Sequence, residues 1–358
     1  MKEPDGEAPM GPYRALRGCV NSVGFQPDER LIPYLELAGF RSTALIRTFN
    51  LRYDLISALV ERWRPKTHTF HLPCGECTVT LEDVAVQLGL PIDGNAVTGA
   101  VRAYIMHLIG GVLMSDANGS KVHLMYLPLL SNLHNTRSYS WGSAVLAMLY
   151  RELCRTTASS AVDMGGCLML LQSWALYRMS FLASISHQSY FIWMSYSAPE
   201  IMAVMPSSAH VHSNLWCISS PIINFNVVEW YHGNRVLWQF DCIQYIPILP
   251  VQLGEIHEMS KKERCGDNWE EVHEEYITIW NNRFGRVPQM DRAPDLQPSL
   301  EYIQWYCETG KPFLFGGRSI VVPPYTTRIT QPLRDLHHAP ERASERASEP
   351  SRSERTTF

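Results

Sequence analysis

The spacing of apolar residues changes twice within residues 54–88, and this change constrains the fold more than any other feature of the chain. From 54 to 64 apolar residues recur every three or four positions, which predicts a helix that Pro65 ends. Over 67–72 they alternate with polar residues in the manner of a strand, and 78–81 can return as its partner after a Pro-Cys-Gly-Glu turn. The segment therefore combines a helix with a β-hairpin.

A further helix is predicted to follow the hairpin directly. Thr80 and Asp83 form a near capping box, in which the threonine oxygen satisfies free N–H groups and the carboxylate complements the helix dipole. Gly89 ends this helix. We expect the packing anchors of this unit and of the later helices to be Trp63, Phe70, Leu72, Leu81, Leu88, Trp141 and Trp280. Replacing a buried anchor by alanine should cost roughly 2–5 kcal/mol.

Helices are predicted to dominate the rest of the chain. A first helix begins near residue 28 and ends at Gly39, with Phe40 as a hydrophobic clasp. Apolar spacing predicts further helices at 101–114, 141–155, 166–179, 267–283 and 300–307, and β-branched residues predict a strand at 221–230. The fold class that follows is mainly α with a small β-hairpin or sheet component, that is, a compact multi-helix α+β domain.

Composition divides the chain into three parts. Residues 1–26 carry glycine, proline and charge without periodicity, which is typical of a flexible lead-in. Residues 27–325 are apolar enough to bury a large core, and we assign them to one domain. From 326 to 358 the composition turns to Arg, Glu, Ser, Ala and Pro, with Glu-Arg-Ala-Ser twice in tandem at 341–348, so this tail is predicted to be disordered.

Charge and hydropathy argue against some classes of partner. A net charge of −4 creates no overall positive field towards nucleic-acid phosphates or anionic membranes. The most apolar stretches are too short or too interrupted to cross a bilayer, so no membrane partner is expected. The first residues hold no apolar run that could act as a signal peptide, and we expect the nine cysteines to be reduced thiols of the cytosol or nucleus.

Four potential zinc ligands lie within ten residues, at His68, His71, Cys74 and Cys77. Their types and the Cys-x-x-Cys spacing are those of a structural zinc site. Strand alternation, however, places the two histidines on opposite faces, and a hairpin with a tight turn already explains the segment. We therefore favour no bound metal, with a zinc-dependent module or enzyme as the less favoured hypothesis.

Common catalytic motifs are missing from the sequence. The Gly-x-Ser-x-Gly, Gly-x-Gly-x-x-Gly and His-Arg-Asp patterns do not occur. The pairs His257-Glu258 and His273-Glu274 lack the second histidine of a zinc protease, and we expect them to be solvated surface residues. No lysine stands in a cofactor-loop context, so no cofactor and no catalytic residue are implied.

An ordered series of segments resembles the plant mobile domain, a family also described as aminotransferase-like or MAIN-like. The series opens with LIPYLELAGF (31–40) and LISALVERWRPKTHTFHLPCGECTVTLEDVAVQLGLPIDGNAVTG (55–99), and continues with YSWGSAVLAMLYRELCRTT (139–157), GGCLMLLQSWALYR (165–178), VVEWYHGNRVLWQF (227–240) and NWEEVHEEYITIWNNR (268–283). The resemblance covers most of residues 27–310. The aminotransferase label finds no cofactor lysine here, which argues against an enzyme.

The resemblance implies a plant protein from a family shared between transposable elements and host genes. Its host members are nuclear factors linked to meristem maintenance, genome integrity and silencing of transposons. By resemblance we expect a non-enzymatic nuclear scaffold with protein partners, a phosphatase-like protein and chromatin-associated factors being the candidates. The family supplies no catalytic residues to transfer.

Two departures from the family pattern leave rival hypotheses open. Gly99 runs straight into the helix near Arg102, where relatives carry a further stretch, so a segment after 99 is expected to be missing. Residues 182–220 are also atypical. The alternatives are a transposon-derived nucleic-acid-binding protein and a degenerate transposon copy.

Overall fold

The computed structural model describes the central part of the chain. The described residues are 17–18, 29, 32–45, 51–72, 75–90, 92, 103–115, 124–130, 133–158, 160–179, 213–254, 268–292 and 299–309. The predicted tail 326–358 lies outside them, as does the predicted lead-in 1–26 apart from β1 (Arg17–Gly18). Most of the atypical segment 182–220 also lies outside them.

Helices make up most of the described chain, as predicted. In chain order they are α1 (Ile32–Leu37), α2 (Arg41–Ala44), α3 (Tyr53–Arg62), α4 (Leu81–Leu88), α5 (Ala103–Leu108), α6 (Leu133–Thr136), α7 (Trp141–Thr156), α8 (Leu168–Arg178), α12 (Trp269–Val272), α13 (Glu274–Asn281) and α14 (Leu300–Thr309). None of the helices so described has the length and apolar character needed to span a membrane.

The strands form small separate sheets. An antiparallel sheet joins β2 (Trp63–Arg64), β3 (Thr69–Leu72) and β4 (Gly75–Cys77), and a second joins β6 (Ser219–Asn224) to β7 (Val227–His232). β1 pairs in parallel with β5 (Asp163–Met164). Helices together with small antiparallel sheets confirm the predicted α+β class.

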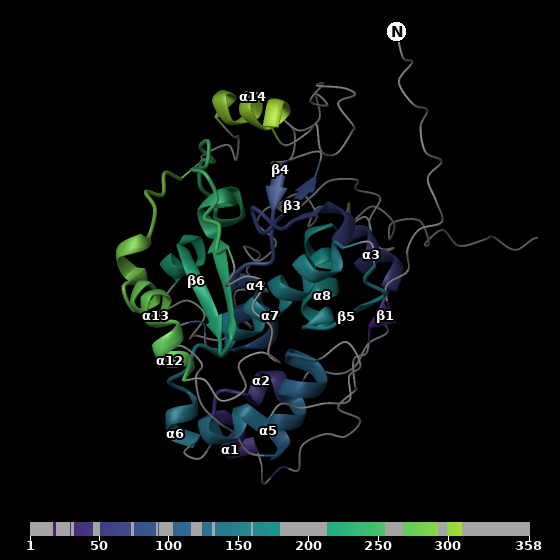
Figure 1. The fold of residues 1–358 in the computed structure, drawn as a ribbon, viewed down its shortest axis with the longest axis vertical. Helices are drawn as coiled ribbons and strands as arrows, with labels where there is room; N and C mark the ends of the chain where they lie inside the picture. Colours follow the sequence, from purple (N-terminus) through teal and green to yellow (C-terminus); the bar gives the residue numbers. More distant parts are fainter. Residues whose placement is uncertain are drawn as a thin grey trace, which may run out of the picture.

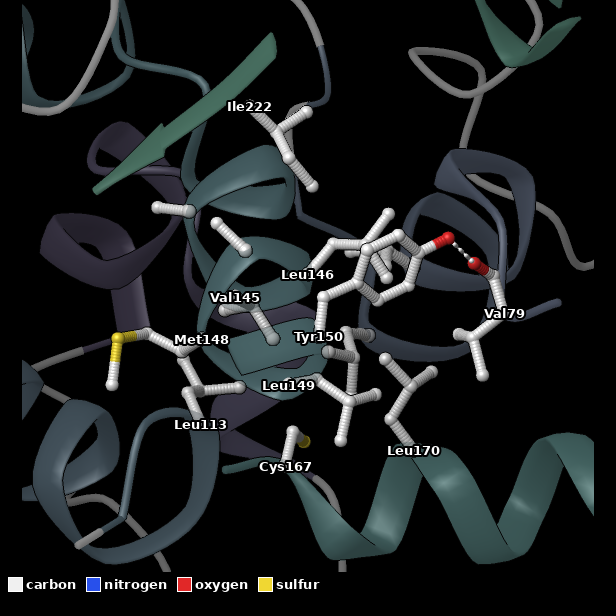
Figure 2. Packing of buried hydrophobic residues seen from close by; sticks show 14 of the residues in the cluster. Val79, Leu113, Val145, Leu146, Met148, Leu149, Tyr150, Cys167, Leu170 and Ile222 are labelled. Carbon is white, nitrogen blue, oxygen red and sulfur yellow. Dashed lines mark hydrogen bonds between the residues drawn. The ribbon is translucent and has the colours of Figure 1, made fainter. Parts of the chain in front are cut away.

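Helix α7 is the centre of the core. Nearly every side chain from Trp141 to Tyr150 is fully buried, as expected for a helix that is apolar all round. Figure 2 shows Leu146 and Leu149 among side chains from α8 and β6, such as Leu170 and Ile222. At one end of this cluster the Tyr150 hydroxyl donates to the Val79 carbonyl at 2.9 Å, which ties α7 to the segment that starts α4.

The other elements surround α7 on several sides (Figure 1). α4 packs against both α7 and α8, and β6 lies between α7 and α13. α1, α2, α5 and α6 gather at one end of the molecule, and α14 lies at the opposite end near β4. The β2–β4 sheet therefore sits between the central helices and α14, where the Tyr306 hydroxyl donates to the Leu72 carbonyl at 2.8 Å.

Local signals explain the ends of the first helices. Gly39 adopts φ 81° just after α1, and Phe40 is fully buried behind it, as the predicted cap requires. The capping box at α4 is complete: Thr80 Oγ1 accepts from the Asp83 N–H at 3.2 Å, and the Asp83 carboxylate accepts from the Thr80 N–H at 2.7 Å. Gly89, with φ 64°, ends α4.

The hairpin differs from its prediction at both edges. The helix predicted to reach residue 64 stops at Arg62, because the residue before a proline is pushed towards extended backbone, and Trp63 and Arg64 become β2. The returning strand also comes earlier than 78–81. β4 pairs Gly75 with Leu72, so the connection is shorter than the predicted turn.

Three predicted elements are divided in the structure. The single strand predicted at 221–230 is wrong: β6 and β7 form a hairpin that turns at Phe225, whose φ is 53°, and the prediction overlooked Asn224 and Asn226, residues typical of turns that flank this position. The helix predicted at 267–283 breaks at His273, which is buried and stacked on Trp269 rather than exposed. The helix predicted at 101–114 changes after Leu108 to a π-helix, Ile109–Leu113.

Candidate functional site

Buried charge is concentrated around the hairpin and α4. Three clusters of ionisable side chains each join this unit to a distant part of the chain. We call them the central cluster (His68, Arg151, Cys154 and Glu229), the Glu76 cluster (Thr69, His71, Glu76 and Arg235) and the Arg178 cluster (Glu82, Asp83 and Arg178).

His68 is held at the tight connection between β2 and β3. Its φ of 51° lies in the left-handed region, which histidine adopts more readily than most non-glycine residues. Its N–H donates to the Arg64 carbonyl at 2.9 Å, and its carbonyl accepts from the Thr78 hydroxyl at 2.9 Å. The backbone is therefore fixed on both sides, and the imidazole is directed into the core, where 5% of the residue is exposed.

The central cluster brings together three elements. His68 Nδ1 lies 2.7 Å from the Trp230 carbonyl of β7, and Nε2 lies 3.3 Å from Glu229 Oε2. The other oxygen of Glu229 accepts from Arg151 Nε on α7. One turn later on α7, Cys154 Sγ lies within 4.8 Å of both the His68 and Glu229 ligand atoms.

The charge state of the central cluster follows from these contacts. Burial alone lowers the pKa of His68, but hydrogen bonding to Cys154 and Glu229 outweighs it and raises the pKa to about 10. His68 is therefore cationic at neutral pH. The pKa of nearby His232 is lowered well below its usual value by burial and by the positive charges of His68 and Arg235, so that ring is neutral.

The Glu76 cluster is a bidentate ion pair in the core. Arg235 donates through Nη2 to Glu76 Oε1 at 2.8 Å and through Nε to Oε2 at 2.9 Å. Thr69 donates to Oε2 at 3.2 Å, and His71 Nε2 lies 3.6 Å from Oε1. Since both charged groups are almost fully buried, the pair joins β4 to the segment after β7 through a desolvated contact.

The Arg178 cluster joins α8 to the start of α4. Arg178 Nη2 lies 3.3 Å from Asp83 Oδ1 and 3.5 Å from Glu82 Oε2. Burial raises the pKa of Glu82 to about 8; Arg178 lowers it and the Asp83 carboxylate raises it, both to a smaller extent. Glu82 is therefore mostly protonated at neutral pH, and Asp83 is the counter-charge of Arg178.

These clusters are enclosed by the fold. Apart from small parts of the Arg151 and Glu82 side chains, their ionisable groups are almost entirely shielded from solvent. Each one connects elements far apart in the sequence, and removing one partner would leave the other charge buried. The arrangement therefore suits tying the fold together better than acting on a substrate from solution.

The candidate zinc ligands of the hairpin segment are not brought together among the described residues. His68 lies in the central cluster, His71 lies beside Glu76 and Tyr306, and Cys77 Sγ lies 3.8 Å from the Phe70 carbonyl. Cys74 lies outside the described residues. The seven expected packing anchors, Trp63, Phe70, Leu72, Leu81, Leu88, Trp141 and Trp280, are all buried in one apolar core.

Sequence reasoning did not find the partners of His68. Cys154 is one of many residues on an apolar helix, and its spacing carries no metal motif. Glu229 does carry a usable signal: it is a lone carboxylate inside the apolar run Val-Val-Glu-Trp-Tyr, and a charge that is fully buried there requires a partner. The sequence alone does not say which partner.

A second candidate site is an apolar strap on the surface, residues 245–251. Leu249 is 89% exposed and Ile248 is 68% exposed, and Tyr245, Ile246 and Val251 are also exposed. The strap is anchored by its backbone: the Ile248 carbonyl accepts from Arg235 Nη1 at 3.0 Å, and the Val251 N–H donates to His232 Nε2 at 3.2 Å. Exposed apolar surface held in a fixed shape is typical of a binding site for another macromolecule.

Comparison with known proteins points to one family. The plant mobile domain profile matches residues 39–102, 98–184 and 179–307. The joins between these matches fall near the two departures noted in the sequence, after 99 and at 182–220. The missing segment itself stays a prediction. No solved structure matches the chain.

Curated relatives come from Arabidopsis thaliana. The serine/threonine-protein phosphatase 7 long form homolog is 31% identical over 75% of this chain, and protein MAIN-LIKE 2 is 35% identical over 42% of it. The matched regions make up 27% and 30% of those two proteins, so the chain spans less than a third of either. Protein MAINTENANCE OF MERISTEMS is 26% identical, over 81% of this chain and 76% of its own length.

Proposed function

Because the chain belongs to the plant mobile domain family, we propose that it is a non-enzymatic nuclear regulatory or scaffold protein that acts by binding other proteins. The relatives' names include maintenance of meristems, and we extend a role of that kind to this chain. We further propose that the chain acts in genome integrity and in the silencing of transposons.

The observation that carries the proposal is the apolar strap. Burying Ile248 and Leu249 in a partner would remove two large aliphatic side chains from water, each worth about 1.5–3 kcal/mol when fully buried. Because the strap is already anchored by Arg235 and His232, little backbone freedom would be lost on binding. A pre-ordered apolar surface is what a protein-binding scaffold requires.

The enclosed ionic clusters support the non-enzymatic part of the proposal. General acid–base or nucleophilic catalysis needs a titratable group that reaches the substrate. His68, Glu76 and Glu229 are instead directed into the core, where His68 is paired with Glu229 and the two carboxylates are held by Arg235 and Arg151. Their ionic interactions join helices and strands.

We propose a phosphatase-like protein as the partner at the strap, with chromatin-associated factors in the same assembly. One relative carries a matched region within a much longer chain named as a serine/threonine-protein phosphatase. In that relative the two parts belong to one chain. We infer that the same domain, present in a separate chain, binds a phosphatase-like protein.

The test is affinity purification of the tagged full chain from plant nuclei, with mass spectrometry of the co-purifying proteins. The variant Ile248→Asp/Leu249→Asp places charge on the strap, and Val162→Asp is the matched control at an exposed aliphatic residue outside it. We expect phosphatase-like and chromatin-associated proteins with the wild type and with Val162→Asp, and their loss with the strap variant. Equal recovery with all three, or no nuclear partner with the wild type, would contradict the proposal.

The rival hypothesis of a transposon-derived nucleic-acid binder has a separate test. Several arginines that could contact phosphates, namely Arg151, Arg178 and Arg235, are instead engaged with buried carboxylates. Direct binding would show affinity for DNA or RNA that falls steeply with salt. We expect the purified chain to show no such binding at physiological salt.

A further inference from the structure

We propose that the central cluster is a zinc site, in which His68 Nε2, Cys154 Sγ and Glu229 Oε2 bind one Zn²⁺ ion. The three ligands come from the β2–β3 connection, α7 and β7. They are far apart in the sequence and carry no spacing motif, so sequence analysis implies no such site.

The donor atoms have the types and spacing that zinc uses. Zinc binds imidazole nitrogen and carboxylate oxygen at about 2.0–2.2 Å and thiolate sulfur at about 2.3 Å, so neighbouring ligands of a tetrahedral site lie about 3.3–3.6 Å apart. His68 Nε2 and Glu229 Oε2 are already 3.3 Å apart. Cys154 Sγ lies within 4.8 Å of both, which small side-chain rotations can reduce.

Each ligand is also held from behind by a second group. His68 Nδ1 faces the Trp230 carbonyl at 2.7 Å, the arrangement that fixes a metal-binding histidine with Nε2 towards the ion. Cys154 Sγ accepts from the Trp63 indole N–H at 3.3 Å, and the far oxygen of Glu229 accepts from Arg151. All three ligands therefore have an outer partner that orients them.

The charge of the cluster is compatible with a bound zinc ion. Binding displaces the proton of the Cys154 thiol and the proton on His68 Nε2, so two protons leave as one Zn²⁺ enters. The site then holds a thiolate, a carboxylate, a neutral imidazole and the Arg151 guanidinium, which leaves a net charge of +1 with the metal. The same formal charge exists without the metal when His68 and Arg151 are cations, Glu229 is an anion and Cys154 is a thiol. The metal adds strong ligand bonds at no added net charge.

The experiment measures metal in the purified full chain. Protein is prepared without chelators, its zinc is counted by elemental analysis, and Co²⁺ is then exchanged for Zn²⁺ to record the sulfur-to-cobalt absorption band of a thiolate ligand. The variants are Cys154→Ser and His68→Asn, the second chosen because asparagine also tolerates the left-handed backbone. Cys77→Ser is the matched control, since Cys77 is also a buried thiol but lies outside the cluster.

We expect one zinc ion per wild-type chain, a rise in Tm on adding zinc, and a thiolate–cobalt band. Both cluster variants should lose these features and Cys77→Ser should keep them. The proposal is overturned if folded wild-type protein takes up less than stoichiometric zinc, a result that does not depend on how the variants fold. It is also overturned if Cys77→Ser loses the metal while Cys154→Ser keeps it, because the four-residue hairpin set would then be the site.

Discussion

Replacing Arg235 with methionine removes the cation that holds the Glu76 carboxylate inside the protein. Both side chains are almost fully buried, and the two hydrogen bonds between them are 2.8 and 2.9 Å long. Removing one partner of such a pair costs about 3–5 kcal/mol, because the remaining charge stays desolvated. His71, 3.6 Å from the same carboxylate, can supply part of the lost compensation, so we expect the lower half of this range.

The double variant Glu76→Leu/Arg235→Met tests the reasoning more sharply. It removes both charges, and exchanging a buried pair for apolar side chains of similar volume is often close to neutral. One bond is lost in either case: Arg235 Nη1 donates to the Ile248 carbonyl at 3.0 Å, and such a bond contributes about 1 kcal/mol. We therefore expect the double variant to recover at least about half of the stability lost in Arg235→Met.

Urea unfolding followed by circular dichroism and tryptophan fluorescence measures these differences. The control is Arg292→Met, which breaks an ion pair to Asp241 in which the Arg292 side chain is 85% exposed, so its midpoint should hardly move. If Arg235→Met unfolds at the wild-type urea concentration, the pair is not desolvated as described. A double variant less stable than the single one would show that packing, rather than unpaired charge, governs this site.

Two further predictions concern neighbouring parts of the fold. Glu82 has a folded-state pKa raised from 4.5 to about 8, so its contribution to stability is complete below pH 4.5 and is lost as the pH rises through 8. Glu82→Gln should remove that part of the decline, measured by urea unfolding across this pH range; an unchanged profile would show that Glu82 is ionised in the folded chain. A Cβ on Gly233 would lie 2.7 Å from the Trp216 carbonyl, whereas one on Gly285 would meet nothing within 4 Å. Gly233→Ala should therefore lower stability by about 1–3 kcal/mol and Gly285→Ala should change it little, and equal thermal midpoints for the two would contradict this contact.

Elements with complete local signals could be predicted from the sequence. The capping box and Gly89 define α4 within a short stretch, and the unbroken apolar periodicity of α7 is enough to place it. Each of these signals lies within the element that it predicts or directly beside it. No distant residue is needed to interpret it.

Elements that depend on distant contacts were harder to predict. The turn at Phe225 was missed because both strands of that hairpin are buried and read as one apolar strand, although Asn224 and Asn226 flank the turn with residues typical of turns. His273 interrupts a good helical pattern where its ring stacks on Trp269, a preference that periodicity does not register. The break at His273 arises from packing that the local sequence does not encode, whereas the turn at Phe225 has a local signal that the apolar pattern outweighed.

The candidate sites show the same division. His68 could be identified as a potential ligand from its residue type, but its neighbours in the structure come from α7 and β7 rather than from the adjacent cysteines. Whether the apolar side chains of residues 245–251 are exposed likewise depends on how the chain is oriented after β7. These features become visible only when the tertiary contacts are known.

One carboxylate in this fold serves two elements at once, and this has a consequence for local opening. Oδ2 of Asp83 receives the N–H of Thr80 at the start of α4, while Oδ1 faces Arg178 on α8. Fraying of the first turn of α4 would therefore also expose a buried guanidinium without its counter-ion. Helix ends normally exchange their amide hydrogens early, through small local openings. Here the amides of Thr80 and Asp83 should exchange at the rate of the α8 interior, as members of one cooperative unit.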